Sequence, residues 1–142
     1  MTGHVLIIES RFYQDISDML LKGAQTALKA AGATFEILTV PGALEMPAAL
    51  SFMHNRKGNI FDAYVALGCV IRGETAHYDI VCNESARGLY DLVLEYDLAL
   101  GNGILTTENR EQAIVRADPN QKNKGGDAAH AAMRMLEIKR EM

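Results

Sequence analysis

The sequence contains little cysteine, with only Cys69 and Cys82 among its 142 residues. Two cysteines are far fewer than a secreted disulfide scaffold carries, and their spacing does not match that of metal ligands. Both stand among apolar residues. We therefore expect two reduced thiols in the core of a cytoplasmic protein.

Long apolar runs and runs of positive charge are also absent. No apolar segment approaches the length of a signal region or a membrane span. The 14 Lys and Arg residues stand against 18 Asp and Glu residues, which gives a net charge of -4. No basic run or basic, aromatic-studded strand is present that could follow a phosphate backbone. We expect neither a membrane nor a nucleic acid as a partner.

The composition is that of an ordinary globular protein, with 49% hydrophobic and 23% charged residues. A chain of this size can bury roughly two thirds of the surface that its unfolded form exposes, so it needs no disulfide or metal to fold. No repeat, low-complexity stretch or linker interrupts the sequence. We expect one domain that spans residues 1–142.

Apolar patterns typical of strands alternate with patterns typical of helices along the chain. The predicted strands cover residues 4–9, 34–40, 63–71 and 98–106; the predicted helices cover 14–31, a segment from about Pro47 to 55, 77–97, a segment after 106 with an Asn109 and Gln112 capping pair, and a C-terminal segment after the polar loop 118–126. The continuous apolar run at 63–71 is typical of a parallel strand that is covered on both faces. The alternation predicts a flavodoxin-like α/β fold, a single-domain three-layer sandwich in which helices flank a four-stranded parallel sheet.

Ligands of such sheets bind at the carboxyl ends of the strands, so the strand-to-helix loops are where a site is expected. The most informative loop is RGETAH at 72–77. Gly73 lets the backbone approach a ligand, the N–H groups that open the next helix favour an anion, and His77 can exchange protons near neutral pH. The combination indicates a phosphorylated substrate beside an acid–base group.

Each of these residues also has an ordinary structural explanation. A lone histidine is more often a core or surface side chain than a catalytic group, and His4, His54 and His130 stay in that class. Glu45, in a first helical turn, often only complements the helix dipole. Because these residues are expected together at one edge of the sheet, a functional site is favoured there. No catalytic triad, Walker loop, zinc signature or dinucleotide-binding pattern competes with this interpretation.

Several segments resemble the lumazine synthase family in order and spacing. They are SRF at 10–12, VPGALEMP at 40–47, GCVIRGETAHYDIV at 68–81, GILTTENREQAIVRA at 103–117 and NKGGDAA at 123–129. The resemblance covers nearly the whole chain. It implies a transferase of riboflavin biosynthesis that condenses 5-amino-6-ribitylaminouracil with 3,4-dihydroxy-2-butanone 4-phosphate, forming 6,7-dimethyl-8-ribityllumazine and releasing phosphate. These small molecules are the implied partners, and no metal or organic cofactor is implied.

The resemblance also implies a role for each matching residue. His77 is expected to move protons during imine formation, phosphate elimination and ring closure. For the pyrimidine substrate, Phe12 is expected to stack on the heterocycle, Val70 and Ile71 to meet the pyrimidine edge, and Lys124 to lie near it. The ribityl chain is expected to bind Glu45 and the backbone of Gly42, Ala43 and Leu44. The phosphate is expected to bind Gly73, Glu74 and Thr75 and to pair with Arg116.

Two positions depart from the family pattern. Asn102 stands where the family usually has an aromatic residue that lines the ring pocket, so weaker packing or a hydrogen bond is expected there. Leu44 stands where an aromatic residue is common. Asn102 is nevertheless expected to contact substrate from that side.

The resemblance further implies a homo-oligomer, a homopentamer. The segment DPNQK at 118–122 lacks the glycine-bearing kink of shell-forming members, which favours an isolated pentamer. We expect each site to be shared, with Phe12 and the loops at 42–45 and 73–77 from one subunit. Asn102, Arg116 and Lys124 are expected from the next subunit.

Two other functions remain open at this point. A lumazine or flavin carrier would keep the pocket without turnover, although the retained His77, Arg116 and Lys124 favour the enzyme. A flavodoxin-like or receiver-like signalling module would show the same alternation, but the acidic cluster expected after a first receiver strand is absent. Incubation with both substrates distinguishes the three functions. The enzyme turns the substrates over, the carrier binds the product without turnover, and the signalling module does neither.

Overall fold

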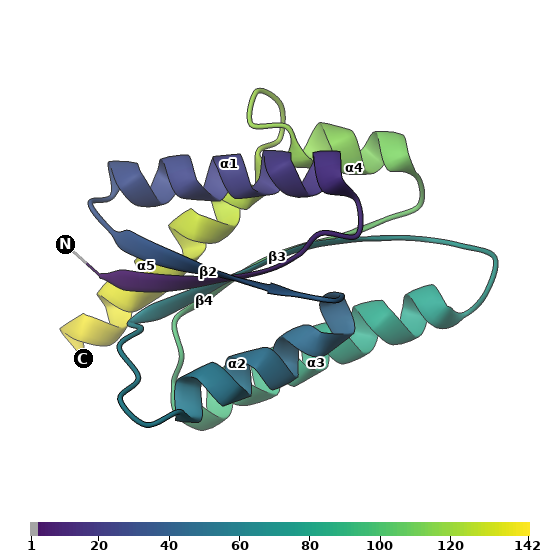
Figure 1. Cartoon of the computed structure of the whole chain (residues 1–142). Helices are drawn as coiled ribbons and strands as arrows, with labels where there is room; N and C mark the ends of the chain where they lie inside the picture. The colour runs from purple at the N-terminus through teal and green to yellow at the C-terminus, as the bar shows by residue number, and fades with distance from the viewer. Residues whose placement is uncertain (1–2) are drawn as a thin grey trace.

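The computed structural model describes residues 3–142, in which strands and helices alternate along the chain (Figure 1). The elements are β1 (His4–Ser10), α1 (Gln14–Ala30), β2 (Thr34–Val40), the short 3-10 helix η1 (Ala43–Glu45), α2 (Met46–Asn55), β3 (Ala63–Ile71), α3 (His77–Tyr96), β4 (Leu100–Thr107), α4 (Arg110–Ala117) and α5 (Lys124–Glu141). The strands lie in the order β2-β1-β3-β4 and are all parallel. Their carboxyl ends therefore lie at one edge of the sheet.

Helices cover both faces of this sheet. In Figure 1, α1 and α4 lie above the sheet, and α2 and α3 lie below it. One hydrophobic cluster packs side chains of α1, α4 and α5 against the sheet, and a second cluster packs those of α2 and α3. The predicted three-layer α/β fold with a four-stranded parallel sheet is confirmed.

The two clusters follow from the alternation of side chains along the central strands. Val5 and Leu6 are neighbours on β1, yet they enter different clusters. β3 lies between β1 and β4 and is buried from Ala63 to Cys69, while its last two residues emerge partly. The apolar run thus forms a strand covered on both faces, as predicted. Its emerging end supplies an apolar surface at the carboxyl edge.

Two glycines let α5 pack closely against β4 and α1. A Cβ atom on Gly101 would lie 1.7 Å from a carbonyl oxygen of α5, and one on Gly125 would lie 2.2 Å from a carbonyl oxygen of α1. Neither position can accept a side chain without a backbone shift. The predicted loop at 118–126 is wrong at its end, because α5 already begins at Lys124. Glycines that suggested a turn serve helix packing here.

Other boundaries differ little from the predicted ones. β4 begins at Leu100, two residues later than expected. The predicted capping pair is confirmed, because the Asn109 side chain accepts a hydrogen bond from the N–H of Gln112 at 2.9 Å. The Gln112 side chain accepts one from the N–H of Glu108 at 2.8 Å, one residue before the expected partner. The pair fixes the start of α4 directly after β4.

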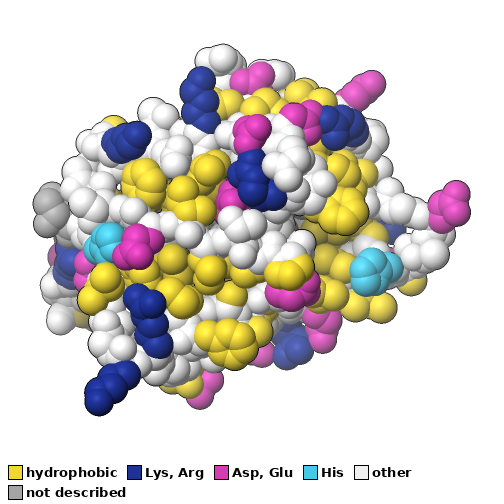
Figure 2. Space-filling view, in the orientation of Figure 1, with side chains coloured by type: hydrophobic (Ala, Val, Ile, Leu, Met, Phe, Trp, Pro, Cys, Tyr) yellow, Lys and Arg dark blue, Asp and Glu magenta, His cyan; other side chains and the backbone are white. Residues whose placement is uncertain are grey.

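The surface mixes charged and hydrophobic side chains. Figure 2 shows hydrophobic groups spread over this face, including its right side, toward the carboxyl ends of the strands. Large apolar side chains are also exposed on α2 and α3, among them Phe52, Tyr90 and Leu94. Within residues 3–142, no helix combines the length and the apolar character needed to cross a bilayer.

Candidate active site

A cleft of about 420 Å³ lies at the carboxyl ends of β1, β2 and β3. Loops that follow these three strands form its walls, and the end of β3 forms its floor. The lining residues are Ser10, Phe12, Tyr13, Pro41, Gly42, Ala43, Leu44, Glu45, Cys69, Val70, Ile71, Gly73, Thr75, His77, Tyr78 and Val81. Polar and apolar groups together line a space that can admit a small heterocycle.

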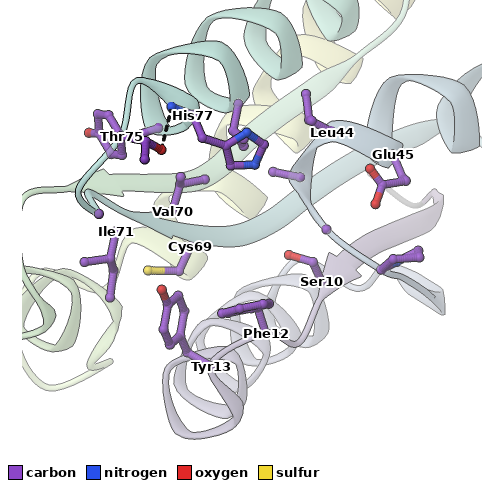
Figure 3. Close-up of a pocket in the computed structure, with 16 residues that line it drawn as sticks. Ser10, Phe12, Tyr13, Leu44, Glu45, Cys69, Val70, Ile71, Thr75 and His77 are labelled. Atoms are coloured by element: carbon purple, nitrogen blue, oxygen red, sulfur yellow. Dashed lines mark hydrogen bonds between the residues drawn. The ribbon is translucent and has the colours of Figure 1, made fainter.

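Phe12 forms one wall of the cleft (Figure 3). Its side chain is 76% exposed, and its ring meets the Tyr13 ring edge-on at 5.0 Å between centroids. Ser17 of α1 donates a hydrogen bond to the carbonyl of Ser10 at 3.0 Å, which joins the end of β1 to the following helix. An exposed, flat aromatic ring beside a cleft is suited to stacking on another ring.

His77 is the first residue of α3 and stands across the cleft from Phe12 (Figure 3). Its backbone N–H donates to Oγ1 of Thr75 at 3.3 Å, and its imidazole points toward the open space. A histidine in this place can accept and donate a proton at a bound molecule. The structure thus brings the predicted acid–base group to the predicted stacking ring.

The loop that joins β3 to α3 offers free backbone donors to the cleft. Within residues 3–142, no acceptor is present for the backbone N–H groups of residues 73–76. The loop is fixed at its start, because the N–H of Arg72 donates to the carbonyl of Thr107 at 2.9 Å and its guanidinium pairs with Glu108 at 2.5 Å. Unpaired N–H groups before a helix are suited to an anion. The exposed side chain of Glu74 does not line the cleft.

The β2–α2 loop closes a third side. The N–H of Glu45 donates to the carbonyl of Gly42 at 3.2 Å, which forms the short helix η1. Ala43 is buried beneath the loop, while Leu44 and the Glu45 carboxylate face outward at the cleft. The loop therefore offers backbone groups, one carboxylate and one apolar side chain to a ligand in the cleft.

A second hollow of about 390 Å³ lies along β4, α4 and α5. It contains the three remaining predicted residues, Asn102, Arg116 and Lys124. Arg116 donates to the carbonyl of Gln112 at 3.1 Å, and within residues 3–142 no carboxylate lies within ion-pair distance of it. Lys124 lies 3.4 Å from Asp127. One chain therefore does not bring these residues to the cleft that contains His77.

The Asn102 side chain is held in this hollow by a hydrogen bond to the backbone. Its carbonyl oxygen accepts a hydrogen bond from the N–H of Ile104 at 2.9 Å. The contact of Asn102 with substrate stays a prediction.

Comparison with known proteins assigns the family. The profile of 6,7-dimethyl-8-ribityllumazine synthases matches residues 2–140. The chain belongs to this family. It is 58% identical over 137 residues to the 6,7-dimethyl-8-ribityllumazine synthase of Bartonella tribocorum, with 96% of this chain and 90% of the relative covered.

Other relatives give the same result. The chain is 56% identical to 6,7-dimethyl-8-ribityllumazine synthase 1 of Rhizobium meliloti over 142 residues, covering 98% of this chain and 93% of that protein. It is 56% identical to the 6,7-dimethyl-8-ribityllumazine synthase of Zymomonas mobilis over 137 residues, covering 96% of both. The cleft and the second hollow both lie within the segment matched to the family.

Sequence reasoning missed several residues that line the cleft of this family member. They are Ser10, Tyr13, Pro41, Cys69, Tyr78 and Val81. Tyr78 and Val81 follow His77 on the helix, and spacing by four residues could have placed Val81 on the same face. Burial raises the pKa of Cys69 to about 12 and raises the pKa of Tyr13. The floor of the cleft thus carries protonated, uncharged groups near neutral pH.

A metal site requires several ligating side chains gathered around one point. Among residues 3–142, no group of three or more His, Cys, Asp or Glu side chains is arranged to hold a metal ion. The polar groups that the cleft offers are backbone N–H groups and the side chains of Ser10, Glu45, Thr75 and His77, with the Tyr13 and Tyr78 hydroxyls and the Cys69 thiol.

Proposed function

We propose that this chain condenses 5-amino-6-ribitylaminouracil with 3,4-dihydroxy-2-butanone 4-phosphate to form 6,7-dimethyl-8-ribityllumazine in riboflavin biosynthesis. The observation that carries the proposal is the position of His77, which faces Phe12 across a cleft and follows a loop with unpaired N–H groups. Membership of the family supports the same reaction.

The heterocycle and its side chain would occupy the apolar part of the cleft. Phe12 stacks on the pyrimidine ring, and Val70 with Ile71 meets its edge. The ribityl hydroxyls lie along residues 42–45, where backbone groups and the Glu45 carboxylate can exchange hydrogen bonds with them. The supporting facts are the exposure of Phe12 and the outward-facing Glu45.

The sugar phosphate would bind at the start of α3. Its phosphate accepts hydrogen bonds from the N–H groups of residues 73–76, and the helix dipole favours its charge. The amino group of the pyrimidine then attacks the ketone and water leaves to give an imine. Phosphate is eliminated, and the second amine closes the ring with loss of water. His77 carries protons between these steps.

The proposal includes a pentamer with sites shared between neighbouring subunits. The cleft lining contains no lysine or arginine, although one substrate carries a phosphate. The second hollow contains Arg116 and Lys124 but no histidine or aromatic ring. In a ring of identical head-to-tail contacts, the hollow of one subunit would complete the cleft of the next. Exposed apolar side chains on α2 and α3, Phe52, Tyr90 and Leu94, favour such burial against a neighbour.

The proposed enzyme works in the cytoplasm as an isolated pentamer. Two free cysteines, one of them buried, support a reducing compartment. The segment at 118–122 supports the isolated pentamer, and light scattering can measure the assembled mass.

The test incubates purified protein with both substrates and follows the absorbance of the lumazine product. Turnover is the expected result. Tight binding of the product without turnover would identify a carrier, and neither turnover nor binding would identify a protein that has kept only the fold.

A further inference from the structure

The Phe12 ring forms a wall of the cleft, but packing alone does not fix its position. Phe12 is 76% exposed, and its only aromatic neighbour within residues 3–142 is Tyr13. An exposed side chain loses freedom when it binds a ligand, so a fixed starting orientation favours binding. The backbone on either side of Phe12 must therefore set the position of the ring.

Glu9, at the end of β1, lies three residues before Phe12. Within residues 3–142 it is the only charged residue in the buried class, with 2% of its surface exposed. Its carboxylate accepts hydrogen bonds from Nη1 of Arg11 at 2.8 Å and from Oγ1 of Thr39 at 2.7 Å. A carboxylate removed from water is strongly disfavoured unless it is paired. Glu9 therefore holds both donors in place.

Arg11 extends this constraint into the loop. Its Nε donates to Oε1 of Gln14 at 3.1 Å, and its Nη2 pairs with Asp18, so that both contacts lie on α1. Burial alone would lower the pKa of Arg11, but hydrogen bonds to Glu9 and Asp18 raise it. One charged guanidinium thus joins β1 to the first turns of α1, and it reaches β2 through Glu9. Phe12 is the next residue in the chain.

We propose that Glu9 and Arg11 are positioning residues, which hold Phe12 where it stacks on the pyrimidine substrate. Neither side chain lines the cleft, so both act through Phe12. This inference rests on the proposed function, because it takes Phe12 as the stacking residue. Since Phe12 meets the pyrimidine and not the sugar phosphate, the pair affects the binding of one substrate only.

The test compares the Kd of each substrate, measured by titration calorimetry on the assembled protein. Glu9→Gln keeps the size of the side chain and removes its charge. We expect the Kd of the pyrimidine to rise about tenfold, within the roughly hundredfold that a 1 Å misplacement can cost, and the Kd of the sugar phosphate to stay unchanged.

Asp18→Asn is the matched control. Asp18 pairs with the same Arg11, but its side chain is 69% exposed. An exposed ion pair contributes little, so both Kd values should stay within about threefold of wild type.

A double variant separates positioning from a purely structural role. In the Phe12→Ala protein, a further Glu9→Gln change should leave the Kd of the pyrimidine unchanged, because no ring remains to be positioned. A further tenfold rise there would overturn the proposal, as would equal rises for both substrates in Glu9→Gln alone. If Glu9→Gln does not assemble, Arg11→Lys makes the same comparison, since lysine keeps the charge but lacks the planar fork of donors.

Turnover by the wild-type protein is measured first. A wild-type protein without turnover overturns the proposed function. Normal wild-type turnover combined with unselective effects of Glu9→Gln overturns only the positioning role.

Discussion

The cleft and the second hollow have similar volumes but opposite chemistry. The cleft, about 420 Å³, joins a histidine and a stacking ring to backbone donors and contains no lysine or arginine. The hollow, about 390 Å³, contains Arg116 and Lys124 but no histidine or aromatic ring. A condensation of a heterocycle with a phosphorylated sugar needs both sets of groups. The difference supports the proposal that each chain carries two halves of a site, and that completing one site takes two chains.

The largest expected effect breaks this division directly. Phe12→Ala and Arg116→Ala proteins, each nearly inactive, are mixed, unfolded and reassembled together. Random assembly should place an intact Phe12 opposite an intact Arg116 at about a quarter of interfaces, if the site is shared across a head-to-tail ring contact. Lumazine formation should then recover well above that of either variant.

Two controls make this mixing experiment decisive. Each variant is also unfolded and reassembled alone, which measures its residual activity in a ring. If both residues act within one chain, no intact site can form in the mixture. Mixed rings of the correct mass that stay inactive therefore contradict the shared site.

The next effect concerns the cleft alone. Loss of an acid–base group typically slows a reaction by roughly 100- to 10,000-fold, and we expect His77→Ala to lower kcat by about 100-fold or less. An amine and a ketone condense without help, and orientation of two reactants can supply about 7 to 11 kcal/mol. Steady-state kinetics measures the change, with the exposed His130→Ala as control. Complete loss of turnover in a folded, substrate-binding His77→Ala protein would show that proton transfer matters more than orientation.

A more selective effect is expected from the hollow. Removing a charge-assisted contact costs about 1.5 to 3 kcal/mol, so Arg116→Ala should weaken the sugar phosphate by about 10- to 150-fold. The Kd of the pyrimidine should change far less. Titration calorimetry of both ligands tests this, with Lys29→Ala as a control for removal of an exposed cation. Equal losses for both ligands would assign Arg116 a general structural role.

The smallest effect is expected at the floor of the cleft. With a pKa of about 12, Cys69 is a thiolate in only about one molecule in ten thousand at pH 8. Iodoacetamide at that pH should leave Cys69 unmodified and turnover unchanged, as peptide mass spectrometry and the absorbance assay can measure. Rapid modification of Cys69 with loss of turnover would mean that the floor opens to solvent.

Much of the fold could be predicted because local patterns agree with the final packing. The apolar run at 63–71 predicts a doubly covered strand, and β3 has the same bounds. The start of α5 could not be predicted in this way, because Gly125 looks like a turn residue in the sequence. Glycine is required at this position because α5 lies close to the backbone of α1, about a hundred residues earlier in the chain.

The candidate site shows the same limit. RGETAH carries its chemistry in adjacent residues, so Gly73 and His77 could be found from the sequence. Glu9 could not, because a carboxylate at the end of an apolar strand gains meaning only from Thr39, thirty positions away on β2. The separation of Arg116 from His77 is likewise a property of the sheet, since β4 carries the hollow away from the cleft.

Asn102 bears on a different stage in the life of this chain. β4 is an edge strand, and the Asn102 side chain accepts the hydrogen bond that the N–H of Ile104 offers. An edge strand with open donors is a template on which identical chains can stack. In a single subunit, the Asn102 side chain leaves one backbone donor fewer for such stacking. An aromatic side chain at this position could not accept that hydrogen bond from the N–H of Ile104.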